Sequence, residues 1–220
     1  MYLVRTPDFV QRLFTSYTWR GKSTDKSVYL TFDDGPIPEV TPWVLEQLSR
    51  YDAKATFFCV GENVERHPDV LQQVIDGGHT VGNHTHNHLS GWGTDHLPYI
   101  RNVRRASEVI DSRLFRPPYG RLSPRKAEYL RRHYRIVMWD VLSGDFDAGL
   151  SPEACFANVV DNVESGSIVV FHDSLKSERN LRYALPQTLE VLSRRGYTFR
   201  AIEDVATAAA RPLRAIETFA

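Results

Sequence analysis

Residues 27–35 read SVYLTFDDG, an apolar run that ends in two adjacent carboxylates and a glycine. The first seven residues are rich in β-branched and aromatic side chains, which predicts a buried strand over 27–33. Asp33 and Asp34 then stand at the carboxyl end of that strand. Neighbouring carboxylates repel each other, so the pair indicates a nearby cation or two different roles.

Further short apolar runs follow, and each is separated from the next by an amphipathic stretch. Strands are predicted over 27–33, 54–60, 79–82, 114–116, 135–140, 167–172 and 197–200, and helices over about 40–50, 68–76, 97–112, 123–133, 152–164, 181–195 and 202–210. This alternation predicts an α/β fold with a parallel sheet covered by helices. Periodicity leaves open whether the sheet closes as an irregular barrel or stays open and doubly wound.

The ends of the predicted helices carry the expected signals. Ser123-Pro124 and Ser151-Pro152 place a capping residue before a proline of the first turn. Gly77-Gly78 and Gly196 follow helical stretches. Because no linker or repeat divides the chain, we predict a single domain over 1–220, in which residues 1–20 form a short helical extension.

Composition and charge exclude some partners. The 220 residues include 27 basic and 27 acidic side chains, so the basic excess of a nucleic-acid-binding protein is missing. The N-terminal stretch carries Arg5, Asp8 and Arg12 and has no long apolar core, which predicts neither a membrane span nor a signal peptide. By sequence we expect a cytoplasmic monomer in which Cys59 and Cys155 are structural thiols.

Reactive side chains recur where the other predicted strands end. His84 and His88 follow the strand at 79–82, Arg116 ends the strand at 114–116, and Asp145 and His172 stand at the ends of two later strands. The carboxyl ends of parallel strands share one edge, where active sites assemble. The sequence therefore predicts one site built from five units.

The histidine pair predicts a metal site. On a helical turn, His84 and His88 would share a face, and one carboxylate of the aspartate pair would complete a three-ligand site with open positions. The cation would neutralise one aspartate and leave the other free as a base. We expect a divalent metal, zinc first, with cobalt or nickel as alternatives. His86 would point away as a spectator or a supporting group.

Five segments carry a resemblance to a known family: TFDDG (31–35), HTHNH (84–88), RPPYG (116–120), the stretch from Trp139 to Asp145, and VFH (170–172). In this order they resemble the motifs of the NodB-type polysaccharide deacetylases, carbohydrate esterase family 4. The resemblance extends over about residues 27–202. It implies a distorted (β/α) barrel of about seven parallel strands and a metal-dependent hydrolase that removes acetyl groups from N-acetylated sugars of chitin or peptidoglycan.

The same resemblance implies roles around the metal. Asp33 would be the catalytic base, and Asp34, His84 and His88 would be the metal ligands. Arg116 would hold the base carboxylate in place.

The remaining motifs imply the groups that handle the substrate. The Tyr119 backbone N–H would help to form the oxyanion hole, and Asp145 would tune Arg116 and His172. His172 would be the general acid that protonates the departing nitrogen, because an amide ion is a very poor leaving group.

Four apolar residues are expected to meet the substrate. Trp92 would stack on a sugar ring, and Trp139 would shape the wall beneath Asp145. Phe146 and Val170 would line the pocket for the acetyl methyl group, where the family often has Trp and Leu. Both replacements keep apolar character, so they predict a changed pocket shape with activity retained.

Two further functions remain open at this stage. The same site would serve an O-acetyl xylan esterase or a hydrolase of small amides. The alternative from another class is a non-catalytic carbohydrate-binding protein. The intact base and acid argue against it, because binding alone requires neither. Polymeric substrates of the family would lie at the cell envelope or outside the cell, in tension with the missing export signal.

Overall fold

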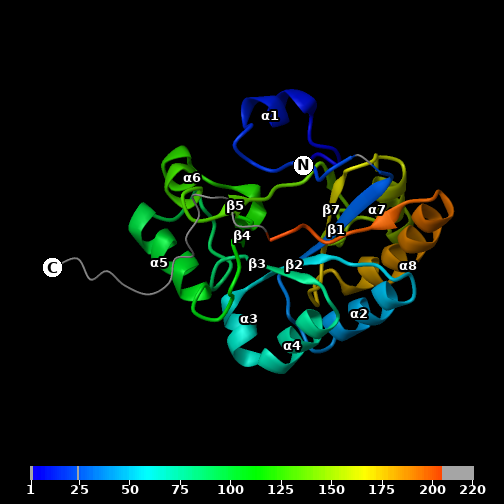
Figure 1. Ribbon diagram of the computed structural model, residues 1–220, viewed down its shortest axis with the longest axis horizontal. Helices are drawn as coiled ribbons and strands as arrows, with labels where there is room; N and C mark the ends of the chain where they lie inside the picture. Colours follow the sequence, from blue (N-terminus) through cyan, green and yellow to red (C-terminus); the bar gives the residue numbers. More distant parts are fainter. Residues whose placement is uncertain (1, 24, 205–220) are drawn as a thin grey trace.

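The computed structural model describes residues 2–23 and 25–204, and its centre is a curled parallel sheet (Figure 1). The strands are β1 (Ser27–Asp33), β2 (Thr56–Cys59), β3 (Thr80–Asn83), β4 (Leu114–Phe115), β5 (Arg135–Ile136), β6 (Val141–Leu142), β7 (Ile168–His172) and β8 (Thr198–Phe199). They follow the order β5-β4-β3-β2-β1-β7-β6, with β8 beside the first residues of β1. The seven strands of this path form a half-barrel, which decides the question of closure that periodicity left open.

Most of the helices cover the outer face of the sheet, whereas the first lies apart from them on the N-terminal segment (Figure 1). The helices within the described residues are α1 (Asp8–Leu13), α2 (Thr41–Ser49), α3 (Gly61–Arg66), α4 (Pro68–Asp76), α5 (His96–Ala106), α6 (Pro124–Leu130), α7 (Pro152–Val160) and α8 (Glu178–Arg194), with the 3₁₀ turn η1 (Pro118–Gly120). Ser151 caps α7 as predicted, because its hydroxyl accepts a hydrogen bond from the Ala154 N–H. Ser123 stands at the N-cap of α6 but makes no side-chain capping bond.

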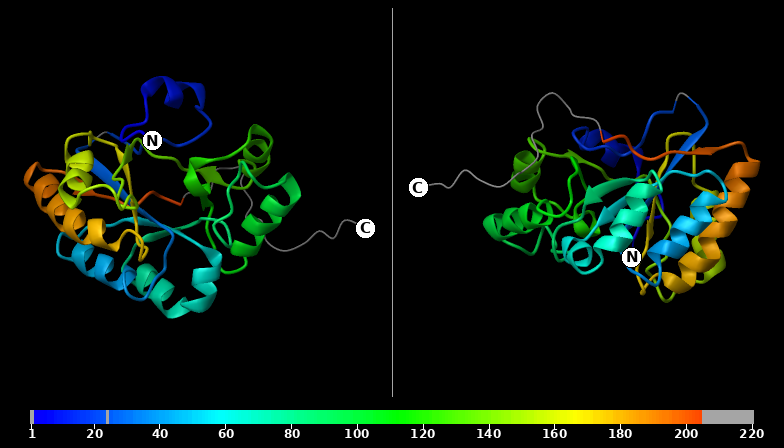
Figure 2. Two further views of the ribbon diagram at one scale, coloured as in Figure 1. Left: turned by 180° about the vertical axis from the view of Figure 1, so that it is seen from behind. Right: turned by 60° about the horizontal axis from the view of Figure 1, so that its bottom comes forward.

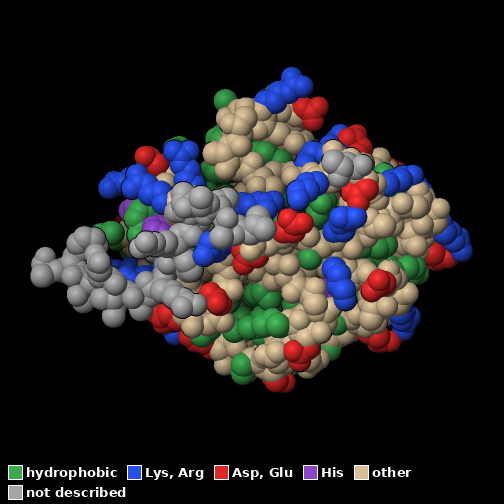
Figure 3. Space-filling view, in the orientation of Figure 1, with side chains coloured by type: hydrophobic (Ala, Val, Ile, Leu, Met, Phe, Trp, Pro, Cys, Tyr) green, Lys and Arg blue, Asp and Glu red, His purple; other side chains and the backbone are tan. Residues whose placement is uncertain are grey.

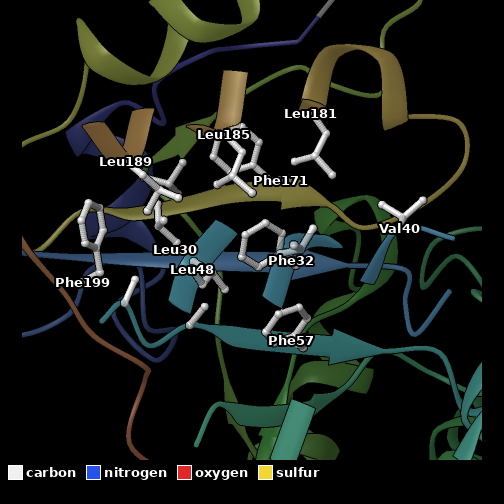
Figure 4. Packing of buried hydrophobic residues seen from close by; sticks show 14 of the residues in the cluster. Leu30, Phe32, Val40, Leu48, Phe57, Phe171, Leu181, Leu185, Leu189 and Phe199 are labelled. Carbon is white, nitrogen blue, oxygen red and sulfur yellow. The ribbon is translucent and has the colours of Figure 1, made fainter. Parts of the chain in front are cut away.

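Strand β1 is buried along its whole length and separates the core from the site. Leu30 and Phe32 point toward the helices, where Figure 4 shows them packed against Phe171 of β7 and leucines of α8. Alternate residues point to the other face of a strand. Thr31 and Asp33 therefore face the inside of the half-barrel.

The N-terminal segment lies between the two ends of the sheet, β5 and β6. The Thr18 carbonyl accepts a hydrogen bond from Met138 just after β5, and the Val4 carbonyl accepts one from Leu142 in β6. Figures 1 and 2 show the segment (dark blue) on the side of the molecule opposite α2 and α4. The predicted extension is thus helical only over Asp8–Leu13, and its flanking residues pair with the sheet.

Several predicted boundaries were wrong for identifiable reasons. The strand expected over 135–140 ends at residue 136, because the Met138 N–H and the Asp140 carbonyl bond to Thr18 and Thr6 of the N-terminal segment. Helix α3 and the turn η1 were not expected, since six and three residues are too short for a clear helical period. The helix predicted over 202–210 falls mostly outside the described residues.

Other expectations concern the surface and the cysteines. Among the described helices, none combines the length and apolar character that a membrane span requires. Cys59 and Cys155 are buried free thiols, as predicted. Figure 3 shows basic and acidic side chains interspersed over the visible face.

Candidate active site

Asp33 forms a buried ion pair at the end of β1. Its Oδ1 accepts a hydrogen bond from Nη1 of Arg116 at 2.7 Å, and both side chains are almost completely buried. Arg116 also donates to the Thr31 hydroxyl and to the Val137 and Met138 carbonyls. Because these bonds fix the guanidinium, the arginine holds the Asp33 carboxylate in one orientation.

Asp34 turns away from its neighbour. It adopts φ 83°, in the left-handed region that aspartate tolerates better than most residues. Its carbonyl accepts a hydrogen bond from Asn63 Nδ2 at 2.7 Å. Its Oδ1 lies 3.2 Å from Nε2 of His88 and 3.7 Å from Nε2 of His84. One backbone torsion thus sends two adjacent carboxylates to different partners.

The loop that carries His84 and His88 corrects the sequence expectation of a helical turn. Residues 84–90 form no helix, and Thr85 and His88 have positive φ values of 66° and 57°. The Asn83 side chain accepts a hydrogen bond from the Thr85 N–H and donates to the Val103 carbonyl, which anchors the loop to α5. The histidines converge through this irregular backbone, with ring centroids 5.1 Å apart.

Asp34, His84 and His88 fit a divalent metal. Their ligand atoms all lie within 4.8 Å of one another, and the buried Asp34 Oδ1 has no hydrogen-bond partner among the described residues. His84 Nδ1 is 2.8 Å from the Arg116 carbonyl, so it donates there and leaves the Nε2 lone pair facing Asp34. Burial lowers the pKa of His84 to about 4, which keeps the ring in its neutral, metal-binding form.

The charge of Asp34 supports the same assignment. Burial alone would raise the pKa of this carboxyl, but the adjacent His88, His172 and His84 hold it well below its usual range. An ionised carboxylate with two imidazoles is a donor set that suits zinc and similar ions.

A second acid–base pair lies beside the first. His172 Nδ1 is 2.7 Å from Oδ1 of Asp145, and the backbone N–H of His172 donates to Oδ2 of the same carboxylate. Burial would lower the pKa of His172, but the charge and hydrogen bond of Asp145 outweigh it and raise the pKa to about 9. Asp145 was expected to tune both His172 and Arg116. It bonds to His172, whereas the hydrogen bonds of Arg116 go to Asp33, Thr31 and two backbone carbonyls.

Tyr119 lies on the His88 side of the site. Its backbone has φ 61°, and its N–H has no acceptor among the described residues. Its ring packs edge-on against His88 with centroids 4.7 Å apart, and 62% of the residue is exposed. This geometry is compatible with the predicted backbone donor and adds an aromatic contact that the sequence did not indicate.

The four expected substrate contacts differ in exposure. Trp92 is 66% exposed, whereas Val170 is 1% exposed and lies below His172 on the inner face of β7. Val170 therefore supports the site from beneath, which corrects its expected place on the pocket lining. Phe146 packs edge-on against His172 at 5.2 Å between centroids. Trp139 is partly buried in the core near Arg116.

Sequence reasoning assigned no role to the residues that hold these loops. Asp173 accepts hydrogen bonds from the Gly35 N–H and the Thr41 hydroxyl, and burial raises its pKa to about 8. Asn102 accepts bonds from the N–H groups of residues 86 and 87. The only sequence feature that points to Asp173 is its position directly after His172. No feature of the sequence singles out Asn102. His86 points away as predicted, toward Glu65.

A curled parallel half-barrel with a two-histidine, one-carboxylate site between two acid–base pairs defines a class of α/β proteins, the NodB-type carbohydrate esterases. Residues 20–135 match the polysaccharide deacetylase family, and the chain belongs to that family. It is 33% identical to a peptidoglycan N-acetylglucosamine deacetylase of Bacillus cereus, over 86% of this chain and 92% of that protein. It is also 34% identical to a chitooligosaccharide deacetylase of Azorhizobium caulinodans, over 76% of this chain and 84% of that one.

Solved structures show the same fold. The peptidoglycan N-acetylglucosamine deacetylase Bc1960, in complex with 4-naphthalen-1-yl-N-oxidanyl-benzamide, superposes with a TM-score of 0.84 at 28% identity, over 94% of this chain and 100% of that chain. A carbohydrate esterase family 4 pseudoenzyme from Bacillus anthracis superposes with a TM-score of 0.69 at 25% identity, over 82% of this chain and 65% of that chain. The fold is therefore shared by enzymes and by a pseudoenzyme.

Proposed function

We propose that this protein is a metal-dependent deacetylase that hydrolyses the acetamido group of N-acetylglucosamine residues in peptidoglycan or chitin-type glycans. One observation carries the proposal. The carboxylate bound to Arg116 and the imidazole bound to Asp145 flank three metal-ligand atoms, and Asp33 and His172 are register partners on adjacent strands. Pure carbohydrate binding needs no such base and acid.

The residues divide the work of amide hydrolysis. Asp33, held by Arg116, accepts the proton of the attacking water. His172 stays protonated because of Asp145 and delivers a proton to the departing nitrogen. The Tyr119 N–H donates to the acetyl oxygen as negative charge develops there, and removing one such donor typically costs about 2.7–4 kcal/mol. Asp34, His84 and His88 would hold the cation, which supplies Lewis-acid polarisation and a more acidic water.

The named relatives support the choice of substrate. Peptidoglycan N-acetylglucosamine and chitooligosaccharide deacetylases are both among them, and all the residues that the reaction requires are present here. Zinc is proposed first, with cobalt or nickel as alternatives for the same ligands. A peptidoglycan substrate would place the protein at the cell envelope.

Acetate release from peptidoglycan and from a chitin oligosaccharide tests the proposal. The protein is stripped with a chelator and then supplied with zinc or cobalt. We expect release only after metal is returned, and a loss of about 10²–10⁴-fold in Asp33→Asn, the usual contribution of a positioned acid–base group. Asp33→Asn should still bind metal, measured by elemental analysis.

Acetylated xylan is the comparison substrate for the esterase alternative. Release from xylan alone would replace the proposed function by an O-acetyl esterase. Metal binding without release from any of the three substrates would favour the non-catalytic binding protein.

A further inference from the structure

A cation stacked on aromatic rings lies on each side of the proposed catalytic centre. On the His88 side, the Arg121 guanidinium lies 5.8 Å from the Tyr119 ring and 5.4 Å from the Trp92 ring. On the His172 side, Lys176 Nζ lies 5.6 Å from the Phe146 ring. Tyr119 contacts His88 and Phe146 contacts His172, so both cations are one ring removed from the centre.

The platform of Trp92 and Arg121 is a built structure. Residue 91 pairs with residue 122 in a parallel β-bridge, and a Cβ on Gly91 would overlap the Arg121 carbonyl. Lys126, although 5% exposed, donates to the Gly91 carbonyl at 2.9 Å. Burying an ammonium group is costly unless its donors are used, so this bond fixes the loop of Trp92 against the loop of Arg121.

Both flanking cations are available to a ligand. Arg121 and Lys176 are exposed, and within residues 2–23 and 25–204 neither forms an ion pair with a carboxylate. Some other surface arginines are paired, such as Arg194 with Glu190 and Arg66 with Glu62. An arginine held against aromatic faces keeps its planar donors in place for a carboxylate, which it can bind through two parallel hydrogen bonds.

These features carry an inference that rests on the proposed function and narrows its substrate. We propose that Arg121 is a specificity-determining residue, which with Lys176 selects a glycan in which a carboxylate-bearing sugar stands on either side of the acetylated one. Aromatic faces of Trp92 and Tyr119 support the sugar ring, and Arg121 binds its acidic substituent. The alternating strand of peptidoglycan has this chemistry, because every second sugar carries a lactyl group that ends in a carboxylate or an acidic peptide. Chitin does not.

The test measures a selectivity ratio with the metal-loaded enzyme. kcat/KM for acetate release is determined on a peptidoglycan-derived oligosaccharide with free lactyl carboxylates and on a chitin oligosaccharide of equal length. We expect the ratio of acidic to neutral substrate to fall at least tenfold in Arg121→Gln, mainly through KM, and to fall further when Lys176→Gln is added. Arg121→Lys should recover part of the ratio. Arg194→Gln, which removes one exposed cation from α8, should leave it unchanged.

Salt provides a second readout. The wild-type preference should shrink as NaCl rises, because exposed charge pairs are screened, whereas the ratio of Arg121→Gln should be nearly independent of salt. An equal loss on both substrates, or no change in the ratio, overturns the inference while the deacetylase assignment stands. Absence of release from both substrates by the wild-type enzyme would instead overturn the proposed function. Melting curves that match the wild type confirm that the exposed substitutions leave the fold intact.

Discussion

Asp33 and Asp34 are neighbours in the chain but belong to different parts of the chemistry. Asp33 is bound by the buried Arg116, and Asp34 faces two imidazoles. The division depends on the positive φ of Asp34 and on the hydrogen bond from Asn63 to its carbonyl. Because each carboxylate faces a partner of its own, the two aspartates avoid the mutual repulsion that their adjacency in the sequence suggests.

Removing Arg116 should destabilise the fold as well as the activity. Arg116→Leu leaves the buried Asp33 carboxylate without its partner, and breaking a buried ion pair in this way typically costs about 3–5 kcal/mol. Urea denaturation measures the free energy of unfolding. The double variant Arg116→Leu with Asp33→Asn should lose less than the sum of the single losses, because the unpaired charge is gone. A loss below about 1 kcal/mol for Arg116→Leu, the range of an exposed pair, would contradict the argument.

The pH profile should report the pair of His172 and Asp145. A general acid must be protonated, so activity is present below the pKa of His172 and lost as the pH rises through it. Asp145 raises that pKa above its ordinary value against the effect of burial. In Asp145→Asn burial should dominate, and the alkaline limb of kcat/KM should move to lower pH. A bound cation shifts the His172 pKa alike in the wild type and in Asp145→Asn, so the difference between them still reports on Asp145. Alkaline limbs at the same pH in both proteins would contradict the prediction.

At the scale of elements, the N-terminal segment is part of the wall of the site. The Tyr2 hydroxyl donates to Asp147 at 3.0 Å, and its ring packs against Phe146 at 5.2 Å. Phe146 in turn packs against His172. The segment that joins the two ends of the sheet therefore reaches the proposed general acid through one aromatic residue.

Tyr2→Ala should lower kcat by about 10- to 100-fold, because small displacements of a catalytic group cost up to about 10²-fold. The matched variant Tyr2→Phe keeps the ring and loses only the hydrogen bond to Asp147, worth about 1 kcal/mol. It should retain most of the activity. Steady-state kinetics separate the two, and equal activity of Tyr2→Ala and the wild type would show that the segment only completes the sheet.

At the scale of the whole molecule, the order of the strands assembles the site. Strand β1 lies between β2 and β7, so its aspartates meet a loop from β3 on one side and His172 on the other. Parallel pairing brings all these carboxyl ends to one edge. The site is therefore a property of the complete sheet.

Metal binding should stabilise the whole fold. A ligand that binds only the folded state at 100 times its Kd adds about 2.7 kcal/mol to the free energy of unfolding. Thermal unfolding of chelator-treated protein, with and without zinc, should show a higher Tm with the metal. The shift should disappear in His88→Ala, which removes one ligand. A shift of equal size in that variant would place the metal elsewhere.

The sequence was most informative where a motif lies on a long regular element. The apolar run of β1 and its terminal aspartates located the strand and the carboxylates, and His84, His88, Arg116, Asp145 and His172 all lie at the predicted edge. Short elements such as α3 and irregular loops gave no periodic signal. The histidine pair was placed correctly relative to Asp34, but for the wrong reason, because its loop is not helical.

By itself, the sequence determined the α/β class, the residues at the carboxyl ends of the strands and the family, because these depend on local periodicity and motif spacing. Only the tertiary structure decided that the positive φ of Asp34 sends the two aspartates to different partners, that Met138 and Asp140 bond to the N-terminal segment, and that Val170 lies beneath the site. It also decided that the Arg121 guanidinium lies over the rings of both Trp92 and Tyr119. The physical reason is that backbone torsions in loops and contacts between distant segments depend on what packs around them, and no local pattern in the chain encodes them.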